Sequence, residues 1–200
     1  SAPIVLTVSA KRPHKNLLRL FEAFAQVRAS PAPVLVVPGY ETFHEDELRR
    51  RAEDLAIGDR VKFAGWISDA LLEGLYREAA CLVFPSLAEG FGLPVLDALV
   101  RGTPVACSNA SSLPEVAGDA ALYFEPTDTD AIQAAIERLL DDAMAGFPRR
   151  FAREDVVELT WRVVQPALDN PGAVHPYFRG EWGPAQADRI LDGDTWFVPS

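Results

Sequence analysis

Two carboxylates, Glu89 and Asp97, flank a glycine-rich turn in the middle of the chain. Gly90 and Gly92 have no side chains, so the backbone between the carboxylates can approach a ligand closely. The turn leads into an apolar-periodic segment at residues 93–100 with a proline in its first turn, which predicts a helix. The N–H groups at the start of a helix bind anions, whereas carboxylates accept hydrogen bonds from hydroxyl groups. The pattern therefore predicts a ligand that carries hydroxyl groups as well as a phosphate.

A basic loop supplies cations that suit such a phosphate. The run SAKRPHKN, which follows the first apolar run of the chain, contains Lys11, Arg12, His14 and Lys15. It is either a solvated basic turn before a helix or a clamp for a diphosphate. No feature of the sequence places an acceptor hydroxyl near His14, so we expect His14 to be an exposed loop residue.

These loops need strands and helices to position them. Short runs rich in β-branched residues predict strands at residues 4–8, 34–37, 61–63, 81–84, 105–107 and 121–124. Apolar residues at helical spacing predict a helix that begins near Leu17, one at 45–56, one capped by Ser68 with Leu71, Leu72, Leu75 and Tyr76 on its apolar face, one at 93–100 and one at 128–140. The alternation predicts an α/β fold with a parallel sheet and helices on both faces. Ligands bind such sheets at the carboxyl ends of the strands, and each loop named above follows a strand.

Bulk composition excludes several classes of partner. The net charge is −10, from 29 acidic and 19 basic residues, which argues against nucleic acid or an anionic membrane as the main partner. No apolar run is long enough to cross a bilayer, so we expect no integral membrane segment and a cytoplasmic location. Cys81 and Cys107 lie in or next to predicted strands and are expected to be reduced. No cluster of His and Cys has metal-ligand spacing, so we expect no metal.

A family resemblance rests on the segment EGFGLPVLDALVRGTPVACSNASSLPEV. It has Glu89, seven intervening residues, Asp97, then Gly-Thr-Pro-Val at 102–105 and Ser-Leu-Pro-Glu at 112–115. This order resembles the donor-site signature of retaining glycosyltransferases of family 4, which are two-domain enzymes of the GT-B fold. The resemblance implies that residues 1–145 form the Rossmann-like C-terminal lobe of such an enzyme, which binds a nucleotide sugar without a metal or other cofactor.

The resemblance also implies roles for individual residues. Glu89 and Lys15 match the family's catalytic positions. The donor-binding positions fall on Arg12, Gly65, Trp66, Glu89, Gly90, Phe91, Gly92, Leu93, Asp97, Ser112 and Glu115.

The chain departs from the family pattern in two places. The family's Gly-Arg pair falls on Ser9 and Ala10, so Arg12 or Lys11 would have to replace the missing cation. Asp97 stands where the family usually has Glu. Its side chain is one methylene shorter, which puts the family's contact with the nucleotide ribose in question.

Two of these positions have structural alternatives. The turn at residues 63–67 resembles the family's base-binding loop, but it also fits a strand-end glycine followed by a core tryptophan, Trp66. Glu115 either approaches the donor or caps the short helix that follows it.

The tail follows a different pattern. From Phe147 onward the chain contains Trp161, Trp182 and Trp196, three of its four tryptophans, and a Trp-Gly-Pro-x-x-Ala-Asp element at 182–188. This region resembles the C-terminal end of glucose-6-phosphate dehydrogenases, so the chain is interpreted as a composite of residues 1–145 and a segment at 146–200. The dinucleotide fingerprint and the catalytic His motif of those enzymes are missing, and the apolar residues of 154–168 are expected to pack on the sheet.

The leading functional hypothesis is the donor lobe of a hexosyltransferase that uses a GDP- or UDP-sugar, with some preference for GDP. Such a lobe is expected to be inactive alone, because the family's N-terminal acceptor domain is not in the sequence. The first alternative is a non-catalytic scaffold or chimeric module. A sugar-nucleotide epimerase on the same fold is a third hypothesis, although its catalytic signature is not apparent.

Overall fold

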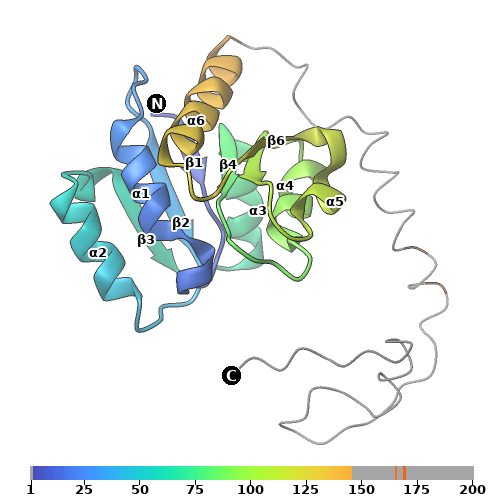
Figure 1. The fold of residues 1–200 in the computed structure, drawn as a ribbon, viewed down its shortest axis with the longest axis horizontal. Coiled ribbons are helices and arrows are strands. Elements are labelled where there is room, and N and C mark those ends of the chain that lie inside the picture. The colour runs from blue at the N-terminus through green and yellow to red at the C-terminus, as the bar shows by residue number, and fades with distance from the viewer. Residues whose placement is uncertain (1, 146–164, 166–168, 170–200) are drawn as a thin grey trace, which may run out of the picture. The chain divides into compact units, whose positions relative to one another are not determined.

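A computed structural model describes residues 2–145, 165 and 169. Its centre is a six-stranded parallel sheet with the strand order β3-β2-β1-β4-β5-β6. The strands are β1 (Ile4–Leu6), β2 (Val34–Pro38), β3 (Val61–Gly65), β4 (Cys81–Phe84), β5 (Val105–Ser108) and β6 (Ala121–Phe124). The predicted α/β class with a parallel sheet is confirmed (Figure 1).

Helices connect successive strands, as parallel pairing requires. They are α1 (Leu17–Gln26), α2 (Glu45–Asp54), α3 (Asp69–Glu78), α4 (Leu93–Val100), α5 (Leu113–Ala117) and α6 (Thr129–Met144), with 3₁₀ turns at Pro13–Lys15, Gly58–Arg60 and Gly118–Ala120. Ser68 caps α3 as predicted, because its side chain accepts a hydrogen bond from the Leu71 N–H. Asp128 caps α6 in the same way, from the N–H groups of Asp130 and Ala131.

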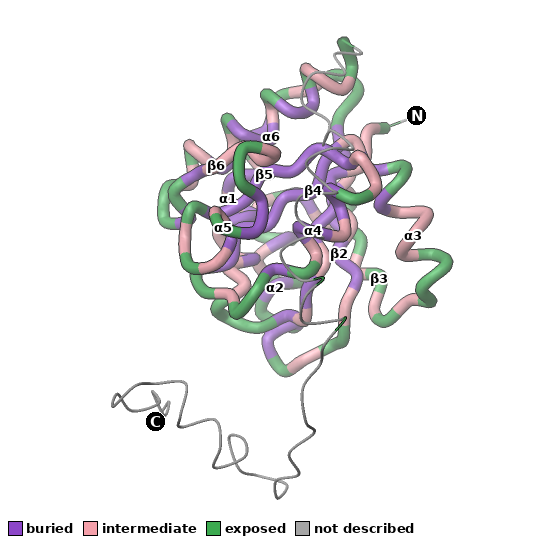
Figure 2. Tube along the Cα trace, turned by 90° about the vertical axis from the view of Figure 1, so that its right-hand side faces the viewer, coloured by how far each residue is buried: buried purple, intermediate pink, exposed green. Residues whose placement is uncertain are grey.

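The central strands β4 and β5 are buried on both faces of the sheet. In β4 the side chains of Cys81 and Val83 join the core cluster formed with α1, α2 and α6, whereas Leu82 and Phe84 join the cluster formed with α3, α4 and α5. All four residues are buried, which explains why β4 reads as a continuous apolar run and not as an alternating one. Figure 2 shows the buried segments along the central strands and the exposed segments in the loops and outer helix faces.

Some predicted boundaries and side-chain orientations were wrong. β1 ends at Leu6 and not at Val8, although the N–H groups of Thr7 and Ser9 still bond to carbonyls of β2. Leu71 was expected on the inner face of α3 but is 54% exposed, whereas Tyr76 is buried as expected. Leu71 lies in the first turn of α3, whereas Leu72, Leu75 and Tyr76 of the same helix pack on the core.

The order of the sheet places β1 and β4 side by side although the chain between them forms two other strands. From β1 the chain proceeds to β2 and β3 on one side, and from β4 it proceeds to β5 and β6 on the other. A crevice forms at the carboxyl ends of two such strands, because the connections that follow them diverge. The basic loop follows β1 and the glycine-rich turn follows β4, so the fold brings both to this crevice.

Lys11 does not point into the crevice. Its side chain is 0% exposed, its ammonium donates to the Gly39 carbonyl, and it lies 3.5 Å from a carboxylate oxygen of Glu45. Its own carbonyl accepts a hydrogen bond from the Thr42 hydroxyl. The loop after β1 is thereby fixed to the loop after β2 and to the start of α2. Lys11 is therefore unavailable as the replacement for the family's missing arginine.

The tail expected at 146–200, including the predicted helix at 154–168, lies outside the described residues apart from positions 165 and 169. Among the described residues, no helix has the length and apolar character needed to cross a membrane.

Replacing Lys11 with Met is expected to destabilise the protein by about 1–3 kcal/mol, because the partly buried Gly39 carbonyl loses its donor while Glu45 keeps only Arg49. Burial lowers the pKa of Lys11 below its ordinary value of 10.5. Between the folded pKa and 10.5 the unfolded chain binds more protons than the folded one, so the stability of the wild type relative to Lys11→Met should rise with pH in that window.

Urea unfolding of both proteins at several pH values measures this difference. Lys62→Met, at an exposed position on β3, is the matched control and should change the free energy of unfolding little. Equal effects of the two substitutions would contradict the structural role of Lys11.

Candidate functional site

Lys15 and Glu89 meet at the crevice between β1 and β4. The Lys15 ammonium lies 2.5 Å from a carboxylate oxygen of Glu89, and the two side chains are 17% and 11% exposed. The ammonium also lies 5.3 Å from the centre of the Phe84 ring, at the end of β4. The structure therefore brings together the two residues to which the family resemblance gave catalytic roles.

Asn16 fixes the loops that carry this pair. Its side-chain amide donates to the carbonyls of Pro85, at 3.1 Å, and Pro126, at 2.7 Å. Asn16 has a left-handed backbone with φ of 58°, a conformation that Asn tolerates better than most residues. The backbone N–H of Leu87 adds a 2.8 Å bond to the His14 carbonyl. One residue beside Lys15 thus joins the loops after β1, β4 and β6.

Two serines hold the backbone of Glu89. The Glu89 N–H donates to the Ser111 hydroxyl at 2.8 Å, and the Ser112 hydroxyl donates to the Glu89 carbonyl at 3.2 Å. Ser112 was expected to contact the donor, and in this structure its hydroxyl positions Glu89. Because both bonds come from the loop after β5, the carboxylate is fixed from two neighbouring strands.

The turn between Glu89 and α4 is open to solvent. Gly90, Phe91 and Leu93 are exposed, and Gly92 has φ of 96°, where a side chain would also collide with Leu113. The expected row of free N–H groups is shorter than predicted. Pro94 has no N–H, and the N–H groups of Val95 and Leu96 both bond to the Gly92 carbonyl. An anion bound here would therefore depend on the turn itself and on the N–H of Leu93.

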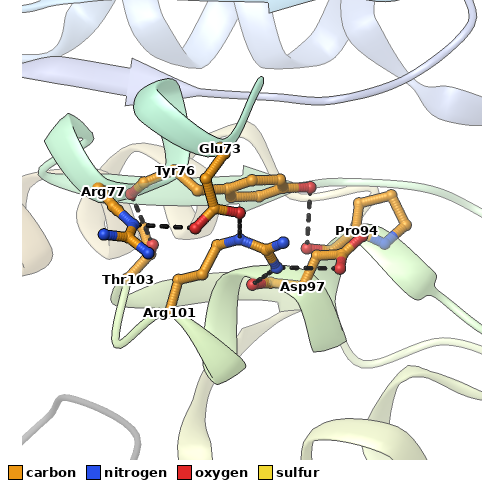
Figure 3. Close-up of polar contacts among 7 residues, drawn as sticks. All are labelled: Glu73, Tyr76, Arg77, Pro94, Asp97, Arg101 and Thr103. Carbon is orange, nitrogen blue, oxygen red and sulfur yellow. Dashed lines mark hydrogen bonds and ion pairs between the residues drawn. The ribbon is translucent and has the colours of Figure 1, made fainter. Parts of the chain in front are cut away.

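Asp97 lies one turn further along α4 and is half exposed. Its carboxylate is 3.0 Å from the Arg101 guanidinium, which also donates to the Asp97 backbone carbonyl at 2.7 Å. Arg101 in turn lies 2.5 Å from Glu73 on α3 (Figure 3). The described contacts place Asp97 in a different ion-pair cluster from Glu89.

Gly65 and Trp66 follow β3. The Gly65 carbonyl accepts a 2.8 Å bond from the Gly39 N–H, so the loops after β2 and β3 are tied together. Trp66 is 65% exposed, which excludes the alternative of a core tryptophan. An exposed indole at the carboxyl edge of the sheet is free to contact a ligand.

Arg12 and Glu115 are exposed at the same edge of the sheet. Arg12 lines a pocket of about 460 Å³ with Pro13, His14, Glu41, Thr42 and Phe43. His14 is exposed, as predicted. Glu115 lies in the first turn of α5, whose N-cap is Ser112, so the alternative that Glu115 caps this helix is wrong.

Sequence reasoning missed four supporting residues. They are Asn16, Ser111, Glu73 and Arg101, each of which acts through a contact with a residue at least four positions away. The left-handed preference of Asn and the i, i+4 spacing of Asp97 and Arg101 were the only signals available. No group of three or more His, Cys, Asp or Glu side chains that could hold a metal occurs in the part of the chain that the structure describes.

Residues 1–154 match the family described as glycosyl transferases group 1. The chain belongs to this family. O-antigen chain mannosyltransferase B of Escherichia coli is 38% identical over 139 residues, which cover 68% of this chain and 36% of that protein. The match therefore spans about a third of the length of that mannosyltransferase.

A solved structure of this architecture is sucrose-phosphate synthase from Thermosynechococcus elongatus. It aligns with a TM-score of 0.65 and 28% identity, covering 84% of this chain and 46% of the synthase. The lobe therefore has the fold of a GT-B glycosyltransferase lobe, as the resemblance implied.

The end of the chain has a second relationship. Residues 114–197 match the C-terminal domain of glucose-6-phosphate dehydrogenase. Glucose-6-phosphate 1-dehydrogenase 1 of Mycobacterium tuberculosis is 56% identical over 64 residues, which cover 32% of this chain and 14% of that enzyme. The expected combination of a glycosyltransferase lobe with a dehydrogenase-like end is confirmed.

Asn16→Gly is expected to lower stability by about 1–3 kcal/mol, because the Pro85 and Pro126 carbonyls lose their shared donor while glycine still adopts the left-handed backbone. Thermal unfolding measures the loss. Asn16→Ala loses the same amide and adds backbone strain, so it should be less stable than Asn16→Gly. A glycine variant as stable as the wild type would show that the three loops do not depend on this amide.

Proposed function

We propose that residues 2–145 form the donor-binding lobe of a retaining hexosyltransferase, which binds a nucleoside diphosphate sugar at the carboxyl ends of β1 and β4. The observation that carries this proposal is the Lys15–Glu89 pair at the crevice of the sheet, 2.5 Å apart and largely shielded from water. A cation and a carboxylate held together at this position match the two chemical needs of a sugar diphosphate.

The proposed binding mode assigns each group a task. The Lys15 ammonium, Arg12 and the turn at residues 90–93 bind the diphosphate, and Glu89 accepts hydrogen bonds from the sugar hydroxyls. Asp97 accepts from the ribose, and the loop with Gly65 and Trp66 contacts the base. Ser112 acts by holding Glu89, and Glu115, exposed in the first turn of α5, is proposed to approach the sugar.

The proposed chemistry is transfer of the hexosyl group with retention of its anomeric configuration. As the bond between sugar and diphosphate breaks, negative charge grows on the departing diphosphate. Lys15 and the N–H groups of the turn stabilise that charge, because they are fixed before the reaction begins. No step in this scheme assigns a proton transfer to His14.

The donor is proposed to be a mannosyl nucleotide. Support comes from the 38% identity with a protein described as a mannosyltransferase. GDP is the preferred nucleotide part of the donor, with UDP as the other candidate. The acceptor belongs to the second domain of a GT-B enzyme, so these 200 residues alone are expected to bind the donor without transferring its sugar.

The chain is further proposed to consist of a donor-binding domain at 1–145 and a separate segment at 146–200. The segment carries the similarity to glucose-6-phosphate dehydrogenase but not the residues for that chemistry. Purified protein should therefore not reduce NADP with glucose 6-phosphate. Heat-labile NADPH formation that scales with protein concentration, followed by absorbance, would overturn this part of the proposal.

Lys15→Ala should weaken GDP binding by about 1.5–3 kcal/mol, the range for a hydrogen bond to a charged group. Isothermal titration calorimetry with GDP and UDP measures the change and identifies the base. Lys62→Ala, which removes an exposed lysine on β3, is the control for net charge and should bind as the wild type does. No measurable binding of either nucleotide by the wild type would refute the proposed function.

Glu89→Gln should separate the sugar from the diphosphate. The substitution removes the carboxylate that pairs with Lys15, so GDP should bind as tightly as before or more tightly. GDP-mannose should lose any advantage over GDP, because an amide is a weaker acceptor for sugar hydroxyls than a carboxylate. Equal loss of affinity for GDP and GDP-mannose would show that Glu89 supports the fold of the loop and does not recognise the sugar.

A further inference from the structure

Arg101 controls the direction of the Asp97 carboxylate from the end of the same helix. It donates from one guanidinium nitrogen to both the Asp97 carboxylate, at 3.0 Å, and the Asp97 carbonyl, at 2.7 Å. Two bonds from one nitrogen fix both the side chain and the backbone of Asp97. Asp97 is therefore not a free surface carboxylate, although half of its side chain is exposed.

Arg101 is itself fixed from α3. Its Nε lies 2.5 Å from Glu73, and its guanidinium lies 5.2 Å from the centre of the Tyr76 ring. Tyr76 is buried, its carbonyl accepts a 2.7 Å bond from the Thr103 hydroxyl, and its own hydroxyl reaches the Pro94 carbonyl at 3.4 Å. Figure 3 shows Arg101 between Glu73 and Asp97, with the Tyr76 ring beside it. The guanidinium thus has a single supported position, set by a neighbouring helix.

Glu73 and Arg101 stay charged over the physiological pH range. Hydrogen bonds from Arg101 and Arg77 lower the pKa of Glu73. Burial acts to lower the pKa of Arg101, but its bonds to Glu73 and Asp97 outweigh burial and raise it. Arg101 therefore stays a cation that donates to Asp97.

The geometry of α4 directs Asp97 toward the crevice. Residues four apart in a helix share a stripe, and their side chains lean toward the N-terminal end. Along this stripe Arg101 leans toward Asp97, and Asp97 leans toward Leu93, where α4 begins beside the glycine-rich turn. Arg101 donates to the Oδ1 atom of Asp97, and none of the hydrogen bonds or ion pairs found among the described residues involves Oδ2. One carboxylate oxygen is held and the other is available.

We propose that Arg101 is a positioning residue for nucleotide recognition: it holds Oδ1 of Asp97 so that Oδ2 accepts a hydrogen bond from a ribose hydroxyl of the bound nucleoside diphosphate. This inference rests on the proposed function. It also answers the question raised by the short side chain at this position. An aspartate reaches less far than a glutamate but has one fewer rotatable bond, and Arg101 removes most of its remaining freedom before the ligand arrives.

The test compares three probes that differ only in the groups under discussion. GDP has the ribose hydroxyls, 2′,3′-dideoxy-GDP lacks them, and inorganic pyrophosphate lacks the whole nucleoside. Arg101→Ala should weaken GDP binding about tenfold, as expected when a hydrogen bond to a charged group is lost, and should leave the other two affinities unchanged. Arg77→Ala is the matched control, because Arg77 pairs with the same Glu73 but does not contact Asp97. It should leave all three affinities unchanged.

Arg101→Lys protects the test against a folding defect in the alanine variant. A lysine keeps the charge but cannot bridge Glu73 and Asp97 with two nitrogens, so the ratio of GDP to dideoxy-GDP affinity should still fall. A wild-type ratio in both Arg101 variants would overturn the inference. Equal losses for GDP and pyrophosphate would also overturn it, since Arg101 would then support the whole site and not the ribose contact.

The outcome separates this inference from the proposed function. If the wild type binds GDP and the Arg101 variants bind all three probes with wild-type affinities, the donor site stands and the role of Arg101 falls. If the wild type binds none of the nucleotide probes, with UDP tested in parallel, both proposals fall together.

Discussion

The side-chain amide of Asn16 is the interaction on which the candidate site depends. It bonds to the carbonyls of Pro85 and Pro126, so the loops after β1, β4 and β6 share one donor group. Lys15 is the preceding residue, and its ammonium can only meet Glu89 if the loop after β1 lies against the loop after β4. The left-handed backbone of Asn16 turns the chain from the basic loop into α1 at this point. The position of the only ion pair described in the crevice is therefore a consequence of this turn and its two bonds.

Parallel topology supplies the second constraint. Lys15 and Glu89 are 74 residues apart, and they meet because β1 and β4 are neighbours while their following helices leave on opposite sides of the crevice. Neither residue lies on a strand or on a long helix. Both lie in short segments held at their ends by buried strands and along their length by bonds such as those from Ser111 and Ser112 to Glu89. The site gains its rigidity from the sheet although it consists of loops.

The sequence predicts those features of the site that have a local pattern and misses those that depend on a distant partner. The bounds of β4, α4 and β6 were predicted correctly, because burial on both faces and helical periodicity are local patterns. The burial of Lys11 was not predicted, because its partners Gly39 and Glu45 are contributed by the loop after β2 and by the start of α2. The attachment of Asp97 to Arg101 has a local signal in the i, i+4 spacing. The anchor that makes it rigid, Glu73, comes from another helix and has none.

Both carboxylates of the signature are paired with a cation in this structure, and this pairing restricts the ligands that fit. Glu89 is largely shielded from water, so a ligand that offers only a phosphate would draw Lys15 away and leave a mostly shielded carboxylate without a partner. A ligand that offers only hydroxyl groups would satisfy Glu89 and leave the lysine ammonium unpaired in the same place. A molecule that carries a phosphate and hydroxyl groups a short distance apart can replace both halves of the ion pair at once. Asp97 differs from Glu89 in this respect. Its exposed oxygen can accept a hydrogen bond from a hydroxyl group while the ion pair with Arg101 stays in place.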